Sequence, residues 1–157
     1  MTRTPVTPDG YAALEAELSH YKEIVRPQIV RDIEEARAHG DISENSEYED
    51  AKERQAHCEG RIALLEGRVA SAEVIDVSRL PESDRVVFGA TVTIESASGE
   101  SRTWRIVGED EADVEGGKIS YKSPLGKALI GRRAGDEATV PAPSGPRTWE
   151  IVQVRYR

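Results

Sequence analysis

Residues 51–72 carry a strict heptad repeat, and this feature constrains the fold more than any other. The positions of its seam alternate in spacing 4, 3, 4, 3, 4, 3, and they are Ala51, Gln55, Cys58, Ile62, Leu65, Val69 and Ala72. Such a seam predicts an amphipathic helix that packs along a second helix in a coiled coil. Cys58 lies on the seam, where a thiol packs as a small apolar group rather than acting in redox chemistry.

A second amphipathic helix is predicted just before it. Thr7, Pro8 and Asp9 form a helix-start signal, with a hydroxyl cap, a proline in the first turn and an acid near the positive end of the dipole. Apolar residues then recur every three or four positions, at Tyr11, Leu14, Leu18, Tyr21, Val25, Ile29, Ile33 and Ala36. The one phase slip lies beside Pro27, which predicts a bend or a restart. We expect an antiparallel hairpin about 45 Å long, from roughly 30 residues at 1.5 Å each.

The composition excludes several classes of protein. The 157 residues include 21 Lys and Arg against 29 Asp and Glu, a formal net charge of −8. This balance disfavours binding to free DNA, because such binding depends on neutralising phosphates. The single cysteine excludes an intrachain disulfide and a zinc ribbon. No apolar run approaches the roughly 20 residues that cross a bilayer, and residues 1–8 lack the apolar region of a secretory signal. We therefore expect a cytoplasmic protein with no membrane contact.

The turn between the two helices is strongly acidic. Five carboxylates lie within residues 41–50, and no Lys or Arg lies among them. Like charges crowded together repel, and this cost predicts a cationic partner. Asp41 and Glu44 are spaced i and i+3, so in a helical segment both side chains point the same way. Two carboxylates suit half of a Mg²⁺ site, which needs its other ligands from elsewhere.

Helix capping is the alternative interpretation of the same acids. In that case Asp41 or Ser43 is the N-cap of the second helix, and Glu44 or Glu47 lies in its first turn. The spacing of two carboxylates is too short a motif to decide between a metal site and a cap.

Beyond a linker at residues 76–84, the apolar period changes to two. Alternating apolar side chains predict strands around residues 90–94, 103–106 and 149–156. Ser123 and Pro124 predict the start of a short helix that ends at Gly131. These signals predict a small α+β domain after the helical hairpin.

Longer strings of sequence resemble a known family. Two strings resemble the bacterial Gre transcript-cleavage factors, which are transcription elongation factors. They are Gly40-Asp41-Ile42-Ser43-Glu44-Asn45-Ser46-Glu47-Tyr48 and Cys58-Glu59-Gly60-Arg61-Ile62. Residues 74–77, 88–92, 106–108 and 123–131 resemble the linker and C-terminal domain of the GreA type. The resemblance covers essentially the whole chain. It implies an α+β protein with an antiparallel coiled-coil hairpin at 1–75, an acidic tip at 40–50, a linker at 76–84 and an FKBP-like domain at 85–157.

The resemblance also implies a function. Family members bind bacterial RNA polymerase and insert the coiled coil into its secondary channel. There the acids that match Asp41 and Glu44 help to hold a second Mg²⁺, and the polymerase cleaves the 3′ end of a backtracked RNA. On this basis the protein is a cofactor of the polymerase rather than an enzyme, and its partners are the polymerase and the 3′ end of the nascent RNA. We expect it to act as a monomer.

Supporting roles are assigned with the same resemblance. Ser43, Asn45, Glu47 and Tyr48 are candidates to support the tip, and Ser123, Pro124 and Leu125 match a loop implicated in docking to the polymerase. Arg37, Lys52 and Arg54 are candidates for RNA contact, with surface ion pairing as the alternative. A channel-binding inhibitor of the same architecture, without cleavage activity, is the alternative function. The intact pair of acids favours cleavage.

Overall fold

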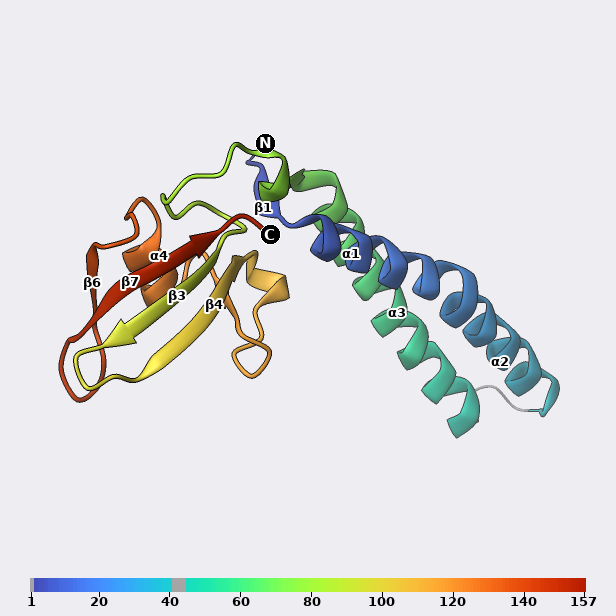
Figure 1. Cartoon of the computed structure of the whole chain (residues 1–157). Helices are drawn as coiled ribbons and strands as arrows, with labels where there is room; N and C mark the ends of the chain where they lie inside the picture. The colour runs from blue at the N-terminus through green and yellow to red at the C-terminus, as the bar shows by residue number, and fades with distance from the viewer. Residues whose placement is uncertain (1, 41–44) are drawn as a thin grey trace. The chain divides into compact units, whose positions relative to one another are not determined.

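The computed structural model describes residues 2–40 and 45–157. The chain divides into two compact units, one built on Tyr11–Ala72 and the other on Arg3–Gly10 together with Glu73–Arg157. The first is a helical hairpin and the second contains a β-sheet and a helix (Figure 1). The predicted α+β fold class, with its helical hairpin and its sheet domain, is confirmed. Within the described residues, no helix is both long and apolar enough to cross a membrane.

The hairpin consists of two arms. The first arm comprises α1 (Pro8–His20), a π-helical turn (Tyr21–Val25) and α2 (Arg26–Ala38), and the second arm is α3 (Ser46–Ser71), which runs antiparallel beside it (Figure 1). In the π-helical turn the Arg26 N–H donates to the Tyr21 carbonyl, five residues back. Pro27 follows at once and has no N–H to continue α-helical bonding, so the wider turn accommodates it. The predicted disruption at this proline is confirmed.

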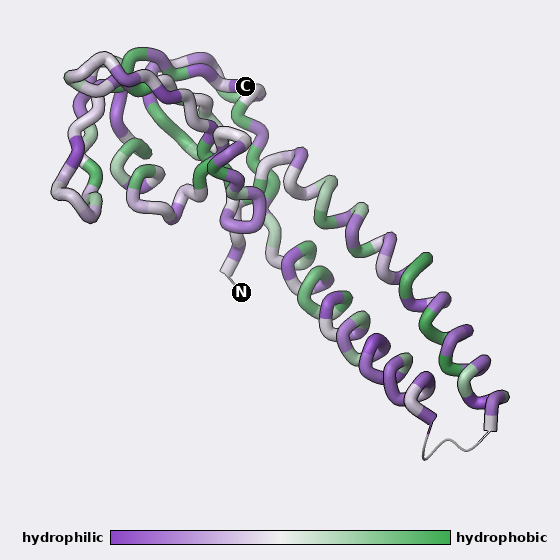
Figure 2. The backbone as a smooth tube through the Cα atoms, turned by 90° about the horizontal axis from the view of Figure 1, so that it is seen from below, coloured by the Kyte–Doolittle hydropathy of each residue, from purple (hydrophilic) through white to green (hydrophobic). Residues whose placement is uncertain are grey.

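The two predicted seams meet in the core of the hairpin. Ile29 of α2 forms a buried cluster with Cys58 and Ile62 of α3. Leu65, also on α3, is fully buried. The hydrophobic stretches recur along both arms in Figure 2. Burial raises the pKa of the Cys58 thiol, which keeps it protonated and fits a packing role. The heptad positions therefore predicted the buried face of α3 correctly.

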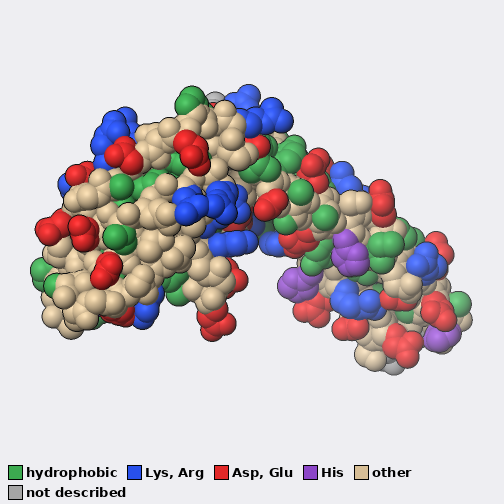
Figure 3. All heavy atoms as spheres, in the orientation of Figure 1, with side chains coloured by type: hydrophobic (Ala, Val, Ile, Leu, Met, Phe, Trp, Pro, Cys, Tyr) green, Lys and Arg blue, Asp and Glu red, His purple; other side chains and the backbone are tan. Residues whose placement is uncertain are grey.

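Ion pairs between exposed or half-buried side chains also join the two arms. They include Arg61 with Glu17 at 2.6 Å, Lys22 with Glu66 at 3.5 Å, Arg26 with Glu59 at 2.6 Å and Arg54 with Asp32 at 2.9 Å. Figure 3 shows the two signs of charge interspersed over the hairpin. Each exposed pair contributes little free energy on its own. Together they favour one register of the arms, because a shifted register separates the opposite charges.

Acid is expected to weaken this register. Hydrogen bonds from Arg54 and Arg26 lower the pKa values of Asp32 and Glu59, respectively. The pKa values of these two carboxyl groups are therefore lower in the folded than in the unfolded chain. The ion pairs stabilise the fold fully above the ordinary carboxylate pKa near 4, and this stabilisation is lost as the pH falls through the folded-state pKa values. We expect Asp32→Asn with Glu59→Gln to show a smaller drop in melting temperature on acidification than the wild type, measured by circular dichroism. Equal drops would contradict the role of these pairs.

The second unit contains a five-stranded sheet within the described residues. Its strands are β3 (Thr91–Ser96), β4 (Ser101–Val107), β5 (Lys118–Ser120), β6 (Glu137–Val140) and β7 (Arg147–Arg155), in the order β5-β4-β3-β7-β6. Only the β4–β5 pairing is parallel among these. Helix α4 (Pro124–Leu129) contributes Leu129 to a core that includes Ile94, Ile106 and Ile151, all at 0% exposure. The three predicted strands and the short helix are confirmed, whereas β5 and β6 were not predicted.

The N-terminal segment is bound to the second unit rather than to the hairpin. β1 (Thr4–Val6) pairs with β2 (Ala72–Val74), and buried Thr7 and Gly108 each donate a backbone N–H to the Glu111 carboxylate, at 3.1 and 3.0 Å. The Gly10 N–H donates to the Thr7 hydroxyl at 3.1 Å, so the predicted helix cap is present. The predicted boundaries placed this segment with the hairpin, but its hydrogen bonds explain why Arg3–Gly10 groups with the sheet.

Candidate functional site

The hairpin end is formed by the last turn of α2 and the first turn of α3. α2 ends at Ala38 with His39 as its C-cap, and α3 starts at Ser46 with Asn45 as its N-cap. Asp41, Ser43 and Glu44 lie outside the described residues, so their predicted roles remain predictions. The structure instead defines the residues that flank this segment on both sides.

Asn45 makes hydrogen bonds to both helices. Its Oδ1 accepts from the Tyr48 N–H at 3.1 Å, and its Nδ2 donates to the Ala36 carbonyl at 2.6 Å. The capping alternative named Asp41 or Ser43, but the N-cap of α3 is Asn45; Glu47 lies in the first turn, as that alternative expected. The cap itself was detectable in the sequence, since asparagine directly before a helix is a strong N-cap signal. The bond to Ala36 had no sequence signal.

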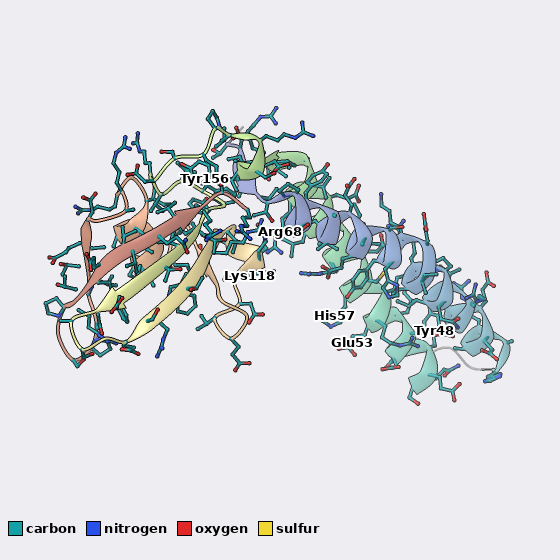
Figure 4. The ribbon with its side chains drawn as sticks, in the orientation of Figure 1. Tyr48, Glu53, His57, Arg68, Lys118 and Tyr156 are labelled. Atoms are coloured by element: carbon teal, nitrogen blue, oxygen red, sulfur yellow. The ribbon has the colours of Figure 1, made fainter. Side chains whose placement is uncertain are left out.

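Side chains of the two helix ends also contact each other. The Arg37 guanidinium lies 6.0 Å from the centre of the Tyr48 ring, and His39 Nδ1 lies 3.4 Å from Glu47 Oε2. Tyr48 is at the start of α3, at the end of the hairpin (Figure 4). The contact with Arg37 gives this tyrosine a packing role that joins the two arms. Glu47 makes an exposed contact with His39. Its predicted role in supporting the tip stays a prediction.

A polar hollow of about 320 Å³ opens beside these contacts. Its lining residues are Asp32, Glu35, Ala36, His39, Glu47, Asp50 and Arg54. Within residues 2–40 and 45–157, no three His, Cys, Asp or Glu side chains gather closely enough to hold a metal ion. The described part of the hairpin end thus provides no complete metal site.

The cations proposed for RNA contact have partners on the hairpin. Arg54 pairs with Asp32 at 2.9 Å and with Asp50 at 3.3 Å. Lys52 donates to Gln55 at 3.0 Å, and Arg37 faces the Tyr48 ring. These contacts support the alternative of surface pairing, above all for Arg54, and RNA contact stays a prediction.

The predicted docking segment lies at the start of α4. The Ser123 hydroxyl accepts from the Gly126 N–H at 3.1 Å and donates to the Ser120 carbonyl at 2.7 Å, so it caps the helix. Leu125 packs against the core of the second unit, and Pro124 is exposed. Of these three side chains, Pro124 is therefore the one most available to a partner.

Comparisons with known proteins place these units in one family. A family model described as "Transcription elongation factor, N-terminal" matches residues 4–74, and one described as "Transcription elongation factor, GreA/GreB, C-term" matches residues 81–156. The transcription elongation factor GreA of Methylococcus capsulatus is 53% identical over 157 residues, covering 99% of each chain. That of Hyphomonas neptunium is 54% identical over 158 residues, covering 100% of each.

A solved structure, GreA factor homolog 1 of Thermus thermophilus, is 30% identical, covers 98% of this chain and 99% of its own, and has a TM-score of 0.44. The two matched segments correspond to the helical hairpin and the sheet domain, and the curated relatives extend over the full length at more than half identity. The chain belongs to the GreA/GreB family of transcription elongation factors.

Proposed function

We propose that this protein binds bacterial RNA polymerase, inserts its helical hairpin into the secondary channel and stimulates Mg²⁺-dependent cleavage of the 3′ end of backtracked RNA. The observation that carries the proposal is the full-length identity of 53–54% to GreA factors, in a chain whose sequence has the acidic pair Asp41 and Glu44 between the two arms of the hairpin. The polymerase performs the hydrolysis, and the protein acts as its cofactor. Arrested transcription complexes would thereby be returned to elongation.

The chemistry assigned to the hairpin end is the completion of a metal site. Asp41 and Glu44 would provide two oxygen ligands, and the polymerase and the RNA phosphate would provide the rest. The chemistry that Mg²⁺ would supply there is a water of lowered pKa, oriented for attack on phosphorus.

Docking is assigned to the second unit. We assign the rim of the channel as the partner of residues 123–125, of which Pro124 is exposed. Docking and metal binding then reside in different units of the chain, so a substitution that affects one function leaves the other in place.

The test uses a backtracked bacterial RNA polymerase complex with RNA labelled at its 5′ end. Adding the protein with Mg²⁺ is expected to shorten the RNA much faster than the complex does alone. Incubation of the protein with the same RNA and Mg²⁺ in the absence of polymerase is expected to leave the RNA intact; cleavage there would indicate an autonomous nuclease. Slower elongation without RNA shortening would contradict the proposal and indicate a channel-binding inhibitor.

A further inference from the structure

The chain contains a single asparagine, Asn45, and a cap alone does not explain why it is an asparagine. An aspartate caps a helix N-terminus as well as an asparagine does, and the helix dipole favours its negative charge. The neighbouring sequence is rich in carboxylates, so an acid here would be in keeping with its surroundings. The amide must therefore supply something that a carboxylate lacks, and that is a hydrogen-bond donor.

The donor has a defined acceptor. Asn45 Nδ2 lies 2.6 Å from the carbonyl oxygen of Ala36, in the last turn of α2, where carbonyls lack the next helical turn as a partner. The same carbonyl accepts the His39 N–H at 3.2 Å, so both of its lone pairs are used. Only one orientation of the amide matches a donor to an acceptor at both ends, with Oδ1 toward the Tyr48 N–H and Nδ2 toward Ala36. A carboxylate would place a negative oxygen against a carbonyl oxygen.

The two bonds of Asn45 differ in kind from the neighbouring contacts. The His39 and Glu47 side chains are 60% and 72% exposed, and their separation is 3.4 Å, so water competes for that pair. Asn45 is half-buried, and both of its partners are backbone groups, which have no side-chain freedom to lose. It therefore fixes the end of one helix directly to the start of the other.

We propose that Asn45 is a positioning residue for RNA cleavage. Its amide ties the last turn of α2 to the first turn of α3, and it thereby fixes the two points between which the chain presents Asp41 and Glu44. Metal ligands need placement to within about 0.5 Å, which is why the fixed helix ends matter. The consequence for cleavage rests on the proposed function, whereas the amide bridge itself does not.

The activity test compares Asn45→Asp and Asn45→Ala with the wild type in the backtracked polymerase complex. Asn45→Asp is the informative change, because it keeps the helix cap, removes the donor and adds a charge that would otherwise favour Mg²⁺. At saturating protein we expect both variants to cleave about 10–100-fold more slowly, the range typical of residues that orient metal ligands. The protein concentration at half-maximal cleavage should stay unchanged, since docking is not affected.

Ser46→Asp is the matched control, because it adds the same charge at the next, exposed position and leaves the amide bridge in place. It should cleave like the wild type. An Asn45→Asp variant with wild-type cleavage would overturn the positioning role, and so would an equal loss in the Ser46→Asp control.

A second measurement tests the bridge without any activity. Since the chain has one asparagine, selective ¹⁵N-asparagine labelling gives one side-chain amide nitrogen by NMR, with a separate signal for each of its two protons. We expect one of its two protons to exchange slowly with solvent and to show hydrogen-bond coupling to the ¹³C-labelled carbonyl of Ala36. Fast exchange of both protons would overturn the bridge. A wild-type protein that failed to cleave would overturn the proposed function instead, and the amide signal would still decide the bridge.

Discussion

Replacing Asp41 by Asn together with Glu44 by Gln is expected to reduce polymerase-mediated RNA cleavage to the level of the polymerase complex alone. The amides keep the size of the side chains but remove the charges that would hold the second Mg²⁺. Loss of several kcal/mol of transition-state stabilisation corresponds to a rate reduction of about 10³-fold or more. The rate is measured as shortening of labelled RNA in the backtracked complex over a range of Mg²⁺ concentrations.

Binding to the polymerase is expected to be nearly unchanged in this variant, as measured by competition with labelled wild-type protein. The matched control is Glu49→Gln with Glu53→Gln, which removes the same charge from two exposed positions of α3. It should retain most of the cleavage activity. A comparable loss of cleavage in the control would mean that the overall negative charge of the hairpin, rather than these two ligands, determines the rate. Loss of polymerase binding by the Asp41 and Glu44 variant would contradict the separation of docking from metal binding.

Leu65→Ala is expected to destabilise the hairpin by about 2–5 kcal/mol, because it removes a buried side chain and leaves a cavity. Leu65 is 0% exposed, and it lies on the heptad seam of α3. The measurement is denaturant unfolding followed by far-ultraviolet circular dichroism, which is dominated by the helices. Both tryptophans, Trp104 and Trp149, lie in the second unit, so their fluorescence follows that unit separately.

The adjacent residue provides the control for this substitution. Leu64 is 45% exposed, and Leu64→Ala removes the same atoms from the same helix without opening a buried cavity. Its cost should stay near the ±0.5 kcal/mol typical of surface positions. We expect the larger shift for Leu65→Ala in the helical signal rather than in tryptophan fluorescence. Equal costs for the two leucines would contradict the heptad assignment of the core.

The elements that the sequence predicted are those with a repeating local pattern. Apolar spacing predicts the seam of α3 and the strands β3, β4 and β7. The chemistry of one residue, Pro27, predicts the interruption of the first arm. Strands β1 and β5, of three residues each, are too short to show an alternation. Their places depend on pairing with partners elsewhere in the chain.

The N-terminal segment shows the same limit. Thr7 is recognisable as a helix cap from its neighbours, and this local role is present in the structure. Its contact with Glu111 joins residues separated by 104 positions, and no local pattern encodes it. That contact assigns the segment to the sheet unit rather than to the helices that follow it.

At the candidate site, the acidic pair, its position between two helices and the resemblance to a family are all readable from neighbouring residues in the sequence. The connection between the helix ends is visible only in the folded chain, because the amide of Asn45 reaches a carbonyl nine residues earlier. Periodicity and residue type are properties of neighbouring positions, whereas a hydrogen bond between two helix ends exists only once the arms have packed in register. The buried seam and the ion pairs along the arms set that register, and the Asn45 amide uses it.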